Sequence, residues 1–201
     1  VDRMALVKDY TVKPDGTLGD ESVYQAWVHN HAKLAYDSVA EWMDGKGPVP
    51  PPLQDPGNAE QVRLQDEAAQ RLKKARFEGG AIELDSRQTR AKMDGEHDKV
   101  LSLEMHHRNR ATELIENLMV AANGVTARFL ESKGMPSIRR VVKTPEKWDR
   151  IVSLAKEKGV ELPRNPDSGA LNDFLLKMKD ADAKRFPDVC LSVVKLLGRG
   201  E

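Results

Sequence analysis

The stretch TELIENLMVAANGVTARFL, Thr112–Leu130, predicts a long helix that carries polar residues within its apolar surface. At 100° per residue, apolar side chains form one stripe along this helix: Ile115, Leu118, Met119, Ala122, Val125 and Phe129. The opposite arc is predicted to face solvent, and it holds Glu113, Asn117, Arg128 and Glu131. Glu116 and Asn123 fall inside the apolar arc. Because an unpaired buried charge is very costly, Glu116 needs a partner, which could be protein or ligand.

Composition limits the class of protein further. The 201 residues suffice for one substantial domain or two small ones, and 39% hydrophobic with 32% charged residues is typical of a soluble, helix-rich chain. Equal numbers of basic and acidic residues exclude a chain that is basic overall, but not a local basic channel. No apolar run has the length of a membrane span and residues 1–18 do not form a signal peptide, so we expect a cytoplasmic protein without a membrane partner. The single cysteine, Cys190, excludes an internal disulfide and is predicted to be a core residue.

The first part of the chain predicts strands and then a helix. Residues 4–12 and 22–29 are expected to pair through a Pro-Asp-Gly turn. Asp37 or Ser38 is expected to cap a short helix that ends near Met43, and a proline-rich surface loop follows at 45–57.

The middle and end of the chain alternate between helices and short strands. A charged helix at 58–77 has a narrow apolar seam, formed by Leu64, Ala68, Leu72 and Ala75. Short strands are expected at 81–84, 92–94, 99–105 and 138–142. Helices are expected at 109–132, from Thr144 and Pro145 to 158, at 168–179, and at 182–197 with an interruption at Pro187. The whole pattern predicts an α+β fold in which long helices pack on antiparallel strands.

Motifs that carry chemistry are scarce. His106 and His107 are adjacent on a predicted strand and therefore point to opposite faces. His29 and His31 share a strand face, but no carboxylate at helical spacing completes a metal site. The chain has no P-loop, dinucleotide fingerprint, serine elbow or aspartate cluster for magnesium, so we assign it no catalytic or metal-binding residue. The basic pairs Lys73-Lys74 and Arg139-Arg140 are expected on solvated faces, with phosphate contact as the alternative.

Four segments, in order, resemble the catalytic RNB domain of the ribonuclease II and ribonuclease R family. They are HAKLAYDSV (31–39), RFEGGAIELD (76–85), NRATELIENLMVAAN (109–123) and RVVKTPEKWDRIVSLAKEKGVEL (140–162). The third segment is the most specific. The likeness spans about residues 1–162 and becomes looser at 171–201.

The resemblance implies roles for particular residues. In the family, the glutamate that matches Glu116 faces the RNA channel, where a carboxylate can accept a hydrogen bond from a ribose 2′-hydroxyl. The alternative is a structural carboxylate bonded to an arginine or a backbone amide. Leu84 stands where ribonuclease II has a base-stacking phenylalanine, so at most it packs against a base. Arg139 and Arg140 are further candidates for RNA contact.

The resemblance also implies which parts of such an enzyme lie elsewhere. The family's magnesium-binding aspartates lie upstream of the matched region, and an arginine that acts at the scissile phosphate lies downstream. We therefore expect residues 1–201 to form the central portion of an RNB domain: strands and a short helix (1–44), a proline-rich loop (45–57), a helix and strand core (58–162) and a helical segment (163–201).

The expected parent protein is a processive, magnesium-dependent 3′→5′ exoribonuclease that binds single-stranded RNA and releases nucleoside 5′-monophosphates. In it, this chain would supply the channel wall but be inactive alone, and a monomer is favoured. Two alternatives remain: a non-catalytic RNA-binding or scaffold protein that keeps the fold, and a helical interaction module unrelated to RNA.

Overall fold

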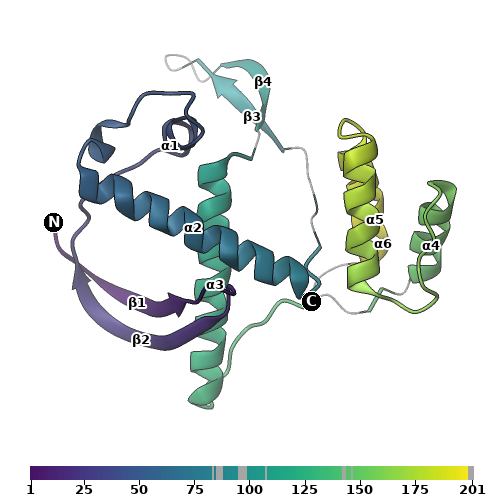
Figure 1. The fold of residues 1–201 in the computed structure, drawn as a ribbon, viewed down its shortest axis with the longest axis horizontal. Helices are drawn as coiled ribbons and strands as arrows, with labels where there is room; N and C mark the ends of the chain where they lie inside the picture. The colour runs from purple at the N-terminus through teal and green to yellow at the C-terminus, as the bar shows by residue number, and fades with distance from the viewer. Residues whose placement is uncertain are drawn as a thin grey trace. The chain divides into compact units, whose positions relative to one another are not determined.

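The structure is a computed structural model that describes residues 1–82, 84, 88–94, 99–106, 108–141, 144–145 and 147–198. This part of the chain contains six α-helices, a short 3-10 helix and two separate two-stranded antiparallel sheets (Figure 1). The mixed α+β class is therefore confirmed. The chain divides into two compact units: unit 1 comprises residues 1–76 and 108–138, and unit 2 comprises residues 77–107 and 139–201.

Unit 1 begins with the expected hairpin of β1 (Arg3–Val12) and β2 (Leu18–Val28). Asp15 closes the turn, because its Oδ1 accepts hydrogen bonds from the Thr17 backbone N–H (3.0 Å) and hydroxyl (2.7 Å). Gly16 has a φ of +80°, and a Cβ there would lie 2.3 Å from the carbonyl oxygen of Arg71 in helix α2 (Pro56–Glu78). Only glycine allows the turn to approach the helix this closely.

Helix α1 (Tyr36–Met43) and the 3-10 helix η1 (Pro51–Leu53) connect the hairpin to α2. The expected cap at Asp37 or Ser38 is wrong: α1 follows Ala35 without a side-chain cap, and Asp37 Oδ1 instead accepts a hydrogen bond from Asn109 Nδ2 at 2.9 Å. The proline-rich stretch is more than a surface loop, since Leu53 is buried in the core of unit 1.

Helix α3 (Arg110–Ser132) has the predicted bounds but not the predicted buried face. Asn109 caps its N-terminus, and Gly134 follows its end in the left-handed conformation with φ +62°. The predicted stripe is partly wrong, because Ile115 and Met119 are 43% and 53% exposed. The buried residues of α3 are Ala111, Leu114, Asn117 and Val125.

The seam expected along α2 is also displaced. Leu64 is 49% exposed, whereas Val62, Asp66 and Ala69 are buried. The core of unit 1 collects residues of α1, η1, α2 and α3, and its buried members are Val39, Ala40, Leu53, Val62, Ala69, Ala111 and Leu114.

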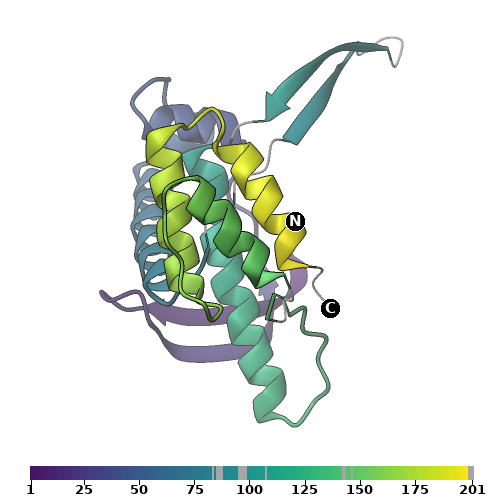
Figure 2. The ribbon, with the colours of Figure 1, turned by 90° about the vertical axis from the view of Figure 1, so that its right-hand side faces the viewer.

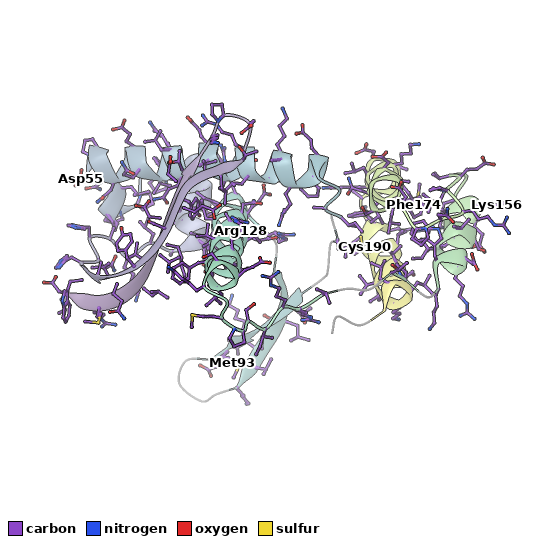
Figure 3. The ribbon with its side chains drawn as sticks, turned by 90° about the horizontal axis from the view of Figure 1, so that it is seen from below. Asp55, Met93, Arg128, Lys156, Phe174 and Cys190 are labelled. Atoms are coloured by element: carbon purple, nitrogen blue, oxygen red, sulfur yellow. The ribbon has the colours of Figure 1, made fainter. Side chains whose placement is uncertain are left out.

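Unit 2 contains an antiparallel hairpin, β3 (Gln88–Met93) with β4 (Val100–His106), which Figure 2 shows as a two-stranded ribbon. It also contains α4 (Trp148–Glu157), α5 (Ser168–Ala181) and α6 (Phe186–Leu197). These helices enclose an apolar core, and two of its residues, Phe174 and Cys190, are labelled in Figure 3. Its buried members are Trp148, Ile151, Ala155, Leu171, Phe174, Leu175, Phe186, Cys190 and Val193. The core position of Cys190 is thus confirmed.

Several elements expected in unit 2 or next to it differ in the structure. Residues 138–141 are not a strand, and Val142 lies outside the described residues. Residues 81, 82 and 84 are not in a strand either. Helix α4 begins at Trp148 rather than near Pro145, and Pro187 lies in the first turn of α6 instead of interrupting it. Proline fits there because the first turn needs no N–H donor within the helix. Among the described helices, none combines the length and apolar character that crossing a membrane requires.

Candidate functional site

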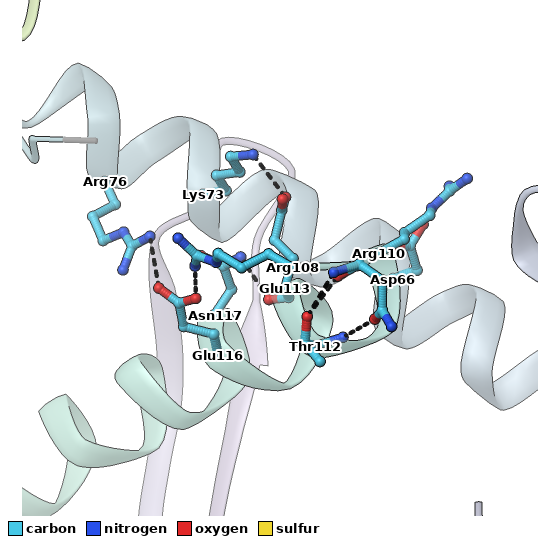
Figure 4. A network of polar contacts seen from close by, with 10 residues as sticks. Asp66, Lys73, Arg76, Arg108, Arg110, Thr112, Glu113, Glu116 and Asn117 are labelled. Carbon is cyan, nitrogen blue, oxygen red and sulfur yellow. Dashed lines mark hydrogen bonds and ion pairs between the residues drawn. The ribbon is translucent and has the colours of Figure 1, made fainter. Parts of the chain in front are cut away.

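Charged side chains join α2 to α3 at three levels within unit 1 (Figure 4). At the first level, the Nε and Nη2 atoms of Arg110 donate to Asp66 Oδ2 at 3.1 and 2.6 Å. The Asp66 side chain is 6% exposed and that of Arg110 44%. These hydrogen bonds raise the pKa of the Arg110 guanidinium and give the buried carboxylate the cation that it needs.

At the second level, Lys73 Nζ donates to Glu113 Oε1 at 2.7 Å. Next to it, Asn117 is buried and its Nδ2 donates to the backbone carbonyl of Glu113 at 2.9 Å. Asn117, predicted to face solvent, thus lies on the buried side of α3, where its amide has a backbone partner.

At the third level, Glu116 lies between two arginines. Its Oε1 is 4.0 Å from Arg76 Nη2 of α2, and its Oε2 contacts Nη2 of Arg108, which precedes the cap of α3. Figure 4 shows both guanidinium groups directed at this one carboxylate. The Glu116 side chain is 34% exposed, so it is only partly buried. The partner that the sequence required is thus present in the protein itself.

The sequence did not identify Arg76 and Arg108 as partners of Glu116. Arg76 is remote from Glu116 along the chain, and only the crossing of α2 over α3 brings them together. Arg108 is two residues from the start of the helix, a spacing that by itself indicates no contact with Glu116.

The other candidates take no part in these ion pairs. Leu84 belongs to unit 2 and packs, partly buried, against its apolar core. Arg139 and Arg140 are exposed residues of unit 2, and Asn123 is exposed on α3.

The histidine candidates do not form a metal site in the described structure. His29 and His31 follow the end of β2; their rings are 5.2 Å apart, and His29 Nδ1 lies 2.7 Å from Asp2 Oδ1. His107 lies outside the described residues. Across the residues that the structure describes, no group of three or more His, Cys, Asp or Glu side chains could hold a metal ion. We assign no metal-dependent step to the described residues.

Comparison with known proteins gives consistent matches along the chain. The family model for the RNB domain matches residues 1–201. Exoribonuclease 2 of Cronobacter sakazakii is 29% identical over 188 residues, which are 92% of this chain and 28% of that protein. Ribonuclease R of Escherichia coli is 31% identical over 172 residues, which are 81% of this chain and 20% of that protein. The chain therefore spans less than a third of the length of these relatives.

Solved structures show the same fold. The apo form of Mycoplasma genitalium RNase R superimposes with a TM-score of 0.86 at 20% identity, over all of this chain and 31% of that one. RNase R of the same organism in complex with double-stranded RNA also gives 0.86, over all of this chain and 35% of that one. The fold is thus that of one part of a larger ribonuclease architecture. The chain belongs to the RNB domain family.

Proposed function

We propose that this chain forms part of the RNA channel in a 3′→5′ exoribonuclease that hydrolyses single-stranded RNA to nucleoside 5′-monophosphates. The match of the RNB family model to residues 1–201 carries this proposal. Sequence relatives that are named exoribonuclease 2 and ribonuclease R support it. RNase R of Mycoplasma genitalium, which shares the fold, has been solved with single-stranded and with double-stranded RNA.

We propose that Glu116 recognises the ribose of the RNA. Its side chain, on α3, is partly exposed, and its carboxylate pairs with two arginines. A carboxylate accepts hydrogen bonds and the ribose 2′-hydroxyl donates one, whereas deoxyribose has no such donor. The proposed role of Glu116 is therefore selection of RNA over DNA and not proton transfer. Leu84, Arg139 and Arg140 remain candidates for weaker RNA contacts.

The hydrolytic step itself is proposed to lie outside residues 1–201. Magnesium ions bound by carboxylates elsewhere in the full-length protein would activate the attacking water. In this proposal residues 1–201 bind and orient RNA but do not cut it, and the full-length protein is a cytoplasmic monomer.

Degradation of labelled single-stranded RNA with magnesium tests the activity, with the 201-residue chain and the full-length protein compared side by side. We expect the full-length protein, but not the 201-residue chain, to remove nucleotides stepwise from the 3′ end of the RNA. Degradation by the 201-residue chain would show that a catalytic site lies within it. If neither degrades RNA but both bind it, the protein is a non-catalytic RNA-binding scaffold. Without binding even at low salt, a helical interaction module unrelated to RNA is favoured.

Glu116→Ala tests the sugar-reading role in a binding assay with RNA and with DNA of the same sequence. Loss of one hydrogen bond weakens RNA binding about 2- to 10-fold, since such a bond contributes roughly 0.5–1.5 kcal/mol. DNA binding is expected to change little, so the ratio of RNA affinity to DNA affinity should fall. Glu113→Ala is the matched control, because it removes a carboxylate one turn away that pairs with Lys73. Equal losses for RNA and DNA in Glu116→Ala would leave this residue with a structural role only.

A further inference from the structure

Arg108 is the more accessible of the two arginines that hold Glu116. Its side chain is 51% exposed, against 31% for Arg76. Arg76 belongs to α2, whereas Arg108 lies in the non-helical segment just before the α3 cap, Asn109. A guanidinium in this position can turn toward a ligand without displacing either helix.

We propose that Arg108 is a second RNA-binding residue, which binds the backbone phosphate next to the ribose that Glu116 reads. The inference rests on the proposed function, because it takes the Glu116 carboxylate to face RNA. Guanidinium matches phosphate in charge and in the planar arrangement of its donors, so it can give two parallel hydrogen bonds. A carboxylate next to a guanidinium is therefore complementary to a ribose next to a phosphate.

The second arginine makes the exchange of partners possible. Glu116 contacts both guanidinium groups. When a phosphate binds Arg108, Arg76 still faces the same carboxylate, so Glu116 keeps a cation beside it. Glu116 in turn gives Arg108 a counter-ion while the channel holds no RNA. The two residues thus have separate tasks: Glu116 distinguishes RNA from DNA, and Arg108 binds the backbone that both share.

Salt dependence of binding distinguishes these tasks. Affinities of the full-length protein for single-stranded RNA and DNA of one sequence are measured with EDTA between about 50 and 300 mM salt, where each phosphate contact changes the slope of log K against log salt by about 0.7. Arg108→Gln is expected to reduce the slope by about that amount and to weaken RNA and DNA equally, about tenfold. Glu116→Gln is expected to leave the slope unchanged and to narrow the preference for RNA.

Arg128→Gln is the matched control. Arg128 is also half-exposed, lies on α3 and pairs with one carboxylate, that of Glu21. Its removal is expected to leave the salt slope at the wild-type value. If Arg108→Gln alone does not fold, Arg108→Gln/Glu116→Gln removes both charges together and should show the same reduced slope.

A slope unchanged by the loss of Arg108, or reduced equally by the loss of Arg128, would overturn the inference. If the wild type still binds RNA in that case, the proposed function is not refuted with it. A wild-type protein that does not bind RNA would instead refute the proposed function, and this inference with it.

Discussion

The two units are stabilised in different ways. The core of α4, α5 and α6 in unit 2 includes three buried aromatic residues, Trp148, Phe174 and Phe186. In unit 1 the described buried cluster contains only aliphatic residues, three of them alanine, and ion pairs join α2 to α3 beside it. Large apolar side chains contribute most where they exclude water completely, whereas charged pairs near the surface contribute little and can change partners. Most of the stabilisation is thus expected from the apolar core of α4, α5 and α6. The ion pairs between α2 and α3 contribute less to stability, but their charged groups can exchange partners.

The largest effect is expected from the apolar core of unit 2. Phe174 is fully buried, so Phe174→Ala should lower the free energy of unfolding by about 3–5 kcal/mol. Urea denaturation followed by the fluorescence of tryptophan, including buried Trp148, measures the loss. Leu176→Ala is the control, because Leu176 lies on the same helix and is 39% exposed. A similarly small loss of unfolding free energy in both variants would mean that burial of Phe174 does not stabilise unit 2.

An intermediate effect is expected in unit 1, where the β1–β2 turn meets α2. Gly16→Ala should cost about 2–3 kcal/mol, because a left-handed conformation costs an L-residue roughly 1–2 kcal/mol and the new Cβ would also overlap the carbonyl of Arg71. Gly45→Ala separates the two causes: Gly45 has a φ of +69°, and its Cβ would meet nothing within 4 Å. Thermal unfolding monitored by circular dichroism measures both. Equal losses of stability in the two variants would show that a Cβ at residue 16 does not clash with α2.

The smallest effect is expected from the exposed ion pair of Glu21 and Arg128. Hydrogen bonds from Arg128 Nε (2.8 Å) and Nη2 (2.6 Å) lower the pKa of Glu21 in the folded protein. The pair therefore stabilises the fold above the unfolded pKa of about 4.3, and this contribution is lost as the pH falls through the lower folded value. Its size is a few tenths of a kcal/mol, as for other exposed pairs.

Glu21→Gln tests this contribution through unfolding free energies at several pH values. The difference from the wild type should be constant above about pH 5 and vanish below the folded pKa. A difference that persists at acidic pH would assign the effect to the shape of the side chain rather than its charge.

Local sequence signals were enough to predict where α3 begins and ends. Which of its sides is buried depends on contacts with residues distant in the sequence. Asn109 and Gly134 mark the ends of the helix in the sequence as they do in the structure. Asn117 falls on the polar arc of α3, so the sequence could not show that the side with Ala111 and Asn117 is buried. Packing against α1, η1 and α2 decides this, because Ala111 and Leu114 belong to the buried cluster that these elements form.

The same distinction explains the candidate site. That Glu116 needs a partner followed from its neighbours in the sequence. The identity of the partners followed only from the structure: the crossing of α2 and α3 brings Arg76 to Glu116, and the segment before α3 brings Arg108. Similarly, the β-branched residues at 138–141 predicted a strand, but a strand requires a partner strand, and the described part of the chain pairs none with these residues.

Unit 1 is discontinuous in sequence, and this has a consequence for its synthesis. The residues Val39 to Ala69 of its core leave the ribosome before Ala111 and Leu114, which complete it. At roughly 5–20 residues per second, the first part of this core waits on the order of 2–8 s for α3. During that interval β1, β2 and α2 expose the surfaces that α3 later covers, so a nascent chain paused before residue 111 should be a preferred client of chaperones.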